Sequence, residues 1–150
     1  MVRPGKIILI VGIIAIFLWI AIFSFAQKPT LLAAPGRWIP ENQIFVYPSK
    51  VVIEVKNASW AGFANTKSMV PFLDQGAHAL EIMPENLSSI NVGDVIAYRS
   101  ENNTIIHRVL EKGEDKQGLY FIVKGDNNDV ADSEKVRAQN LKGVLVAIIY

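Results

Sequence analysis

The longest apolar run of the chain lies at its amino terminus. Residues 7–26 contain no charged side chain and a single hydroxyl. At 1.5 Å of rise per residue, about 20 apolar residues in a helix span about 30 Å of hydrocarbon, so this run predicts a transmembrane anchor. Residues 1–6 carry Arg3 and Lys6, and this positive charge predicts a cytoplasmic amino terminus with the rest of the chain outside the cytoplasm.

A cleavable signal peptide is the alternative interpretation of the same run. Ser24 and Ala26 are small residues at the spacing of a signal-peptide cleavage site. The apolar core of a signal peptide is usually only about 7–15 residues long, however, and this run is longer. Its length therefore favours an anchor that stays in the protein.

After residue 26 the pattern changes to short apolar runs between turn residues. Residues 27–43 hold three prolines and a glycine and predict a linker. Beyond them, runs rich in Val, Ile and Tyr recur between Gly, Asn, Asp and Pro clusters, which is typical of short strands rather than amphipathic helices. We therefore predict a mainly β domain over residues 44–150, built as a small barrel or sandwich. The predicted strands cover residues 44–47, 50–56, 79–83, 94–99, 104–110, 119–124 and 144–150.

The composition excludes several classes of function. The chain has 15 Lys and Arg against 14 Asp and Glu, a balance too even for a nucleic-acid-binding protein. It has no cysteine, which excludes disulfides, thiolate metal sites and a cysteine nucleophile. With only two histidines, a three-histidine zinc site is impossible. Four acidic residues gather between 126 and 134, but their spacing does not match the ligand order of a calcium-binding EF-hand loop.

Three residue types suited to nucleophilic catalysis occur in separate segments. Ser68 lies two residues after Thr66, and His107 lies inside an apolar run. A serine hydroxyl is a poor nucleophile unless a base takes its proton, and an imidazole is suited to that task. Carboxylates follow at Asp126 and Asp132, and an acid of this kind would orient the imidazole. Because neighbouring residues on a strand alternate, the side chain after His107 is expected to face the other way.

These segments resemble the type I signal peptidase family, in its archaeal, endoplasmic-reticulum and sporulation-associated branch. The family pattern has a Ser-Met-x-Pro box, a Gly-Asp strand, a His-Arg-Val box and a Gly-Asp-Asn-Asn box with a trailing acid. All four occur here in that order. They are Ser68-Met69-Val70-Pro71, Gly93-Asp94-Val95-Ile96, His107-Arg108-Val109 and Gly125-Asp126-Asn127-Asn128 through Asp132.

The resemblance implies a serine endopeptidase with a small signal-peptidase-like β domain and no metal or organic cofactor. It implies Ser68 as nucleophile and His107 as general base, in the box where the bacterial branch has a lysine. Asp132 matches the acid that ends the last box, and Asp126 matches its Gly-Asp position. The sequence leaves open which of Asp126, Asp129 and Asp132 orients the base.

Three further residues near Ser68 receive roles from the same resemblance. Thr66 and Lys67 replace a common Ser-Gly pair, and the Thr66 hydroxyl is expected to stabilise the oxyanion together with the backbone N–H of Ser68. Met69 and Pro71 are expected to shape the turn and the apolar substrate pocket.

The sequence therefore predicts a membrane-bound signal peptidase whose catalytic domain lies outside the cytoplasm. The membrane is expected to be the cell membrane or one of endoplasmic-reticulum type. The expected partners are preprotein signal peptides, the lipid bilayer and other subunits of a membrane processing complex, with no nucleic acid. Two alternatives remain, a dedicated processing protease for one partner and a non-catalytic β domain that binds extended peptides.

Overall fold

The computed structural model describes Trp19 and residues 32–150. The predicted anchor, residues 7–26, lies outside the described residues apart from Trp19, as does the amino-terminal part of the predicted linker. Within the described part, no helix combines the length and the apolar character that crossing a membrane requires.

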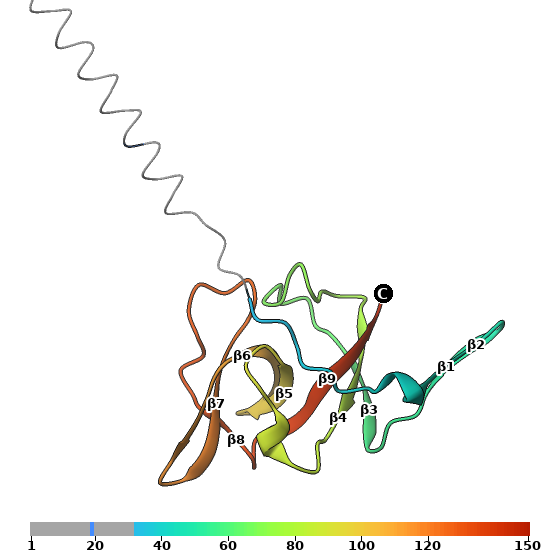
Figure 1. Cartoon of the computed structure of the whole chain (residues 1–150). Helices are drawn as coiled ribbons and strands as arrows, with labels where there is room; N and C mark the ends of the chain where they lie inside the picture. Colours follow the sequence, from blue (N-terminus) through green and yellow to red (C-terminus); the bar gives the residue numbers. More distant parts are fainter. Residues whose placement is uncertain (1–18, 20–31) are drawn as a thin grey trace, which may run out of the picture. The chain divides into compact units, whose positions relative to one another are not determined.

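Residues 32–150 are mainly β, as predicted (Figure 1). From residue 32 the chain runs without regular structure to Pro40, and within residues 32–150 the only helices are two single turns of 3-10 helix. The elements in order are η1 (Glu41–Gln43), β1 (Ile44–Tyr47), β2 (Lys50–Ile53), β3 (Ala58–Gly62), β4 (His78–Ile82), η2 (Leu87–Ser89), β5 (Val95–Ser100), β6 (Asn103–Asp115), β7 (Gly118–Lys124), β8 (Val136–Arg137) and β9 (Leu141–Ile149).

The strands form two open antiparallel sheets. The large sheet has seven strands in the order β3-β4-β9-β5-β6-β7-β8, and the small one is the β1–β2 hairpin. The expected closed barrel is not formed, because β3 and β8 remain the two edges of the large sheet. With only two residues, β8 offers little backbone for a closing ladder. A two-stranded hairpin also gives no second layer of the kind that a sandwich needs.

The β1–β2 hairpin carries much of the exposed apolar surface. Phe45, Val46, Tyr47 and Val51 all belong to it, and Val46 is 76% exposed. In the described part of the chain, its two strands pair only with each other.

The middle of the large sheet is covered on both faces. Every residue of β5 from Val95 to Tyr98 is buried, although successive side chains point to opposite faces. Val95 belongs to one apolar cluster, which also contains Met69 and Leu73. Ile96 and Tyr98 belong to another, on the opposite face. The large sheet therefore separates two small cores, and β5 and β6 carry side chains into both.

Candidate active site

The described structure brings His107 and Asp132 into contact. His107 lies on β6 opposite Ile96 of β5, and it is only 6% exposed. Its Nδ1 lies 2.6 Å from Oδ2 of Asp132. The backbone N–H of Asp132 donates to the carbonyl oxygen of Val123 at 2.9 Å, which fastens the acid-bearing loop beside the end of β7. A carboxylate held against Nδ1 fixes the ring orientation and leaves Nε2 for proton transfer.

A tyrosine shares the same carboxylate. Tyr98 lies on β5, two residues after Ile96, which is the cross-strand neighbour of His107. Its hydroxyl donates a hydrogen bond to Oδ2 of Asp132. Burial raises the pKa of this phenol far above its ordinary value, and the hydrogen bond to Asp132 raises it further. Tyr98 is therefore a hydrogen-bond donor across the physiological pH range.

Ser68 is held in place by the loop that follows β7. Its carbonyl oxygen accepts the backbone N–H of Asn127 at 2.9 Å, and the Asn127 side chain donates to the carbonyl of Lys67 at 3.1 Å. A side chain at Gly125 would bring a Cβ within 2.6 Å of the Ser68 carbonyl oxygen, so the close approach requires glycine. The Gly-Asp-Asn box thus supports the Ser68 backbone directly.

Thr66 lies beside Ser68, as its predicted role requires. The two hydroxyl oxygens are 3.2 Å apart, and the backbone N–H of Ser68 reaches the Thr66 hydroxyl only at 3.5 Å. Lys67 between them has φ of +58°, a conformation that favours glycine. A glycine would adopt this backbone conformation without the strain that the Lys67 side chain imposes.

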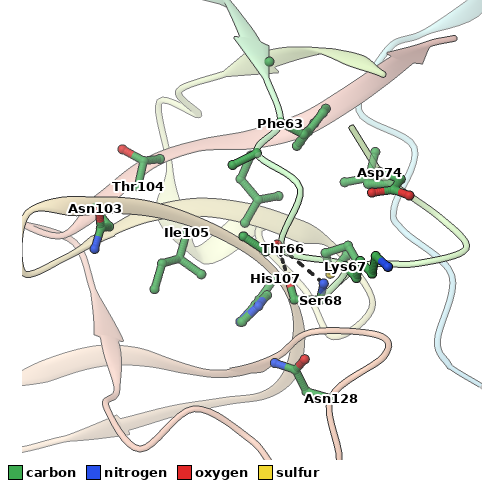
Figure 2. Close-up of a pocket in the computed structure, with 15 residues that line it drawn as sticks. Phe63, Thr66, Lys67, Ser68, Asp74, Asn103, Thr104, Ile105, His107 and Asn128 are labelled. Carbon is green, nitrogen blue, oxygen red and sulfur yellow. Dashed lines mark hydrogen bonds between the residues drawn. The ribbon is translucent and has the colours of Figure 1, made fainter. Parts of the chain in front are cut away.

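Ser68, His107, Thr66 and Met69 line one cavity of about 440 Å³ (Figure 2). In the described part of the chain the Ser68 and His107 side chains line the same cavity without a direct hydrogen bond between them. Pro71, the other residue expected in the substrate pocket, does not line this cavity. The remaining walls come from residues on either side of Ser68, from the start of β6 and from the loop after β7. They include Gly62, Phe63, Leu73, Asp74, Asn103, Thr104, Ile105, Ile106 and Asn128.

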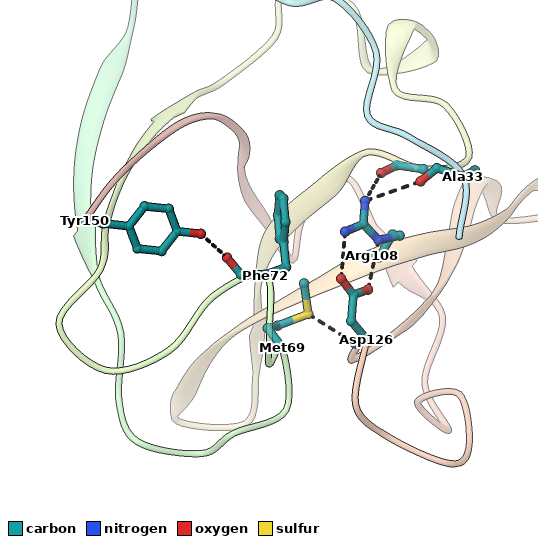
Figure 3. A network of polar contacts seen from close by, with 7 residues as sticks. Ala33, Met69, Phe72, Arg108, Asp126 and Tyr150 are labelled. Atoms are coloured by element: carbon teal, nitrogen blue, oxygen red, sulfur yellow. Dashed lines mark hydrogen bonds and ion pairs between the residues drawn. The ribbon is translucent and has the colours of Figure 1, made fainter. Parts of the chain in front are cut away.

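Asp126 has a different partner from Asp132. Its two carboxylate oxygens accept from Nε and Nη2 of Arg108 at 2.8 and 2.6 Å (Figure 3). Arg108 also donates to the carbonyl oxygens of Gly93 at 2.8 Å and Ala33 at 3.3 Å. Of the three acids left open by the sequence, the structure brings Asp132 to His107 and pairs Asp126 with Arg108. Asp129 is exposed.

Two features of the site were not expected from the sequence. Tyr98 was assigned no role, although its place two residues after Ile96 puts it on the His107 face of the sheet. The contacts of Asn127 with the Ser68 segment were also missed, because they depend on how a loop folds back. For the residues described, no group of three acidic or histidine side chains is arranged to hold a metal ion.

Comparison with known proteins gives two distant relatives. The chain is 28% identical over 132 residues to Signal peptidase I W of Bacillus subtilis. This alignment covers 87% of the present chain and 63% of the relative. The chain is 31% identical over 77 residues to an uncharacterised protein of Methanocaldococcus jannaschii, covering 51% of this chain and 38% of the relative. The chain thus spans less than two thirds of the length of either relative. No family model matches the chain. No solved structure matches it either.

The match to Signal peptidase I W suggests a signal-peptidase-like relationship.

Proposed function

We propose that this chain is a membrane-bound serine endopeptidase that removes signal peptides from exported preproteins. The observation that carries the proposal is the contact of 2.6 Å between His107 and Asp132 at a cavity that Ser68 also lines. The likeness to Signal peptidase I W supports it independently. Nucleophile, base and orienting acid come from three distant segments, and this convergence favours catalysis over a purely structural role.

In this proposal Ser68 attacks the carbonyl carbon of the scissile peptide bond. His107 takes the hydroxyl proton on Nε2 and then gives it to the leaving amine, while Asp132 stabilises the imidazolium. The side chains of Ser68 and His107 close up when substrate binds, since catalytic hydrogen bonds are often long or absent in a free enzyme. Water then hydrolyses the acyl-enzyme and regenerates Ser68.

The oxyanion is stabilised by two donors beside the nucleophile. The backbone N–H of Ser68 makes only a long contact, at 3.5 Å, and is available to the developing negative charge. The Thr66 hydroxyl, 3.2 Å from the Ser68 hydroxyl, turns to donate the second hydrogen bond.

The substrate is an extended peptide that lies along the cavity. Gly62 and Phe63 form one wall, and Asn103 to Ile106 form the other. Both walls include strand ends whose backbone groups can pair with an added strand, which gives affinity without regard to side chains. Met69 and Phe63, both large side chains, line this cavity together with Ser68, and in this proposal they leave room only for small side chains next to the scissile bond. Signal peptides, with small residues before their cleavage site, match this shape.

In this proposal residues 7–26 anchor the protein in the membrane, because their length and apolar character are those of a transmembrane helix. With the amino terminus in the cytoplasm, the catalytic domain lies outside it, in the compartment where preproteins emerge. Other subunits of a processing complex are further candidate partners in the same membrane.

The test is cleavage of a synthetic preprotein by the full-length chain in detergent, with product masses measured directly. We expect cleavage after a small residue, and loss of that cleavage in Ser68→Ala. Ser49→Ala, which alters an exposed serine in the β1–β2 turn, is the matched control and should cleave like the parent. Cleavage that survives in Ser68→Ala, or a folded parent that cuts no preprotein, would contradict the proposal. The second result would favour a dedicated processing protease or a peptide-binding domain.

A further inference from the structure

Tyr98 places a single polar atom beside the proposed catalytic acid. The residue is only 3% exposed, and its ring packs among the buried apolar side chains of the core that includes Ile96 and Val109. Its hydroxyl donates to Asp132, and the centroid of its ring lies 6.4 Å from that of His107. The ring packs in the apolar core. A hydroxyl buried there needs a hydrogen-bond partner, and Asp132 is that partner.

The phenol and the imidazole contact the same carboxylate oxygen. Tyr98 reaches Oδ2 of Asp132 from β5, and His107 Nδ1 lies 2.6 Å from it on β6. Two donors on adjacent strands, together with the backbone bond from Asp132 to Val123, restrict the carboxylate to one orientation. Without the phenol, the imidazole would be the only group among the described residues that holds the carboxylate of Asp132.

The other charged groups nearby leave this arrangement undisturbed. Glu134 is exposed, and its negative charge raises the pKa of the Tyr98 phenol less than burial and Asp132 do. Arg108 follows His107 on β6 and pairs with Asp126 instead. Lys124 of β7 donates to the carbonyl oxygen of Asn128. The negative charge of the Asp132 carboxylate is therefore stabilised by both Tyr98 and His107.

We propose that Tyr98 is a positioning residue, whose phenol holds Asp132 in the orientation that aligns His107 and takes part of the carboxylate's negative charge. The inference deepens the proposed function, because it concerns the base of that same peptidase. A carboxylate that already accepts one hydrogen bond is a weaker partner for an imidazolium. Removal of the phenol hydroxyl should therefore make Asp132 attract the protonated form of His107 more strongly.

The chain offers a direct measurement of this effect, because it contains only two histidines. The ring of His78 stacks on the exposed Trp60, with centroids 5.1 Å apart, and gives an internal reference. We would label histidine with ¹³C, follow both rings by NMR against pH in the full-length chain in detergent, and compare the parent with Tyr98→Phe. Tyr120→Phe removes a hydroxyl that contacts Glu111, on another part of the sheet, and serves as the control.

In Tyr98→Phe, we expect the titration midpoint of His107 to rise by about half a pH unit or more, with that of His78 unchanged. The acidic limb of the kcat/KM profile should move by the same amount. Tyr120→Phe should shift neither. In an Asp132→Asn background, adding Tyr98→Phe should produce no further shift, since the shared acceptor charge is gone.

An unchanged or lowered His107 midpoint in folded Tyr98→Phe would overturn the inference, even if the parent cleaves preproteins. A raised midpoint in a protein that cleaves nothing would support the coupling and refute the proposed function. If Tyr98→Phe does not fold, the same His107 titration can be followed in Tyr98→Leu, which also lacks the hydroxyl at this buried position. An unchanged or lowered His107 midpoint in that variant would likewise overturn the inference.

Discussion

The ion pair between Arg108 and Asp126 should matter more for stability than any other charge pair in the described structure. The two side chains are 6% and 5% exposed and meet through two hydrogen bonds of 2.6 and 2.8 Å. In Asp126→Asn the side chain keeps its size but loses its charge. The guanidinium then remains buried without a counter-charge, and breaking a buried pair in this way costs about 3–5 kcal/mol.

The lower end of that range applies here. Arg108 keeps three favourable contacts in the variant, with the carbonyl oxygens of Gly93 and Ala33 and with the face of the Phe72 ring, which lies 4.8 Å from the guanidinium carbon. A loss of about 3 kcal/mol reduces the ratio of folded to unfolded protein by about 100-fold. For a domain of this size, such a change is a large share of the total stability.

Urea denaturation of the full-length chain, followed by circular dichroism, measures the loss. Urea is preferable to guanidinium because it adds no salt that would screen the charges. Asp115→Asn is the matched control, since Asp115 also accepts hydrogen bonds from two cations, Lys135 and Arg137, but lies where solvent screens them. If Asp126→Asn lowers the urea midpoint no more than Asp115→Asn does, burial does not set the value of this pair and the reasoning is refuted.

Three further substitutions test other parts of the structure. Thr66→Val should lower kcat by about 100-fold if the hydroxyl stabilises the oxyanion, and unchanged turnover beside an inactive Ser68→Ala would remove Thr66 from the mechanism. Lys67→Gly should raise the melting temperature, with a gain of up to about 1 kcal/mol, because φ of +58° strains a residue with a Cβ; Lys67→Ala keeps the strain and should give no such gain. Glu81 is buried with one carboxyl oxygen unpartnered, and burial raises its pKa, so the folded state holds this proton more tightly than the unfolded chain does. Stability should therefore fall as pH rises from the ordinary carboxyl range through the raised pKa, and Glu81→Gln should be more stable than the parent at about pH 8 but similar at about pH 4. A stability difference that stays constant across this range would contradict the assignment.

Strands with a strong side-chain pattern could be predicted from the sequence. The apolar run expected at residues 119–124 is observed as β7, with β-branched and aromatic residues throughout its middle. The segment Ala58–Gly62 was missed because Ala, Ser and Gly carry little strand preference, and it becomes β3 only through its pairing with β4. The two-residue β8 gives no pattern at all. Whether the sheet closes depends on such weak edge strands, which explains why the expected barrel was wrong.

The site could be predicted residue by residue but not contact by contact. The expectation that Arg108 and His107 face opposite ways follows from strand alternation, and their separate partners agree with it. The choice between Asp126 and Asp132 depends on how residues 125–132 turn after β7, and no local sequence pattern encodes that path. The contact between Tyr98 and Asp132 depends on the register between β5 and β6, and the sequence of one strand alone does not give that register.

The β1–β2 hairpin has a consequence for how the domain opens. A two-stranded ribbon is marginally stable in water when it stands alone, and this one forms no ladder with the large sheet in the described part of the chain. Its amide protons should therefore exchange with solvent through local fraying, at a free energy well below that of global unfolding. The amides of Val95–Tyr98 in β5 and of His107–Val109 in β6 belong to buried residues and should exchange only when the whole domain unfolds. A protease specific for lysine should accordingly cut first after Lys50, at the hairpin turn, and leave the seven-stranded sheet intact.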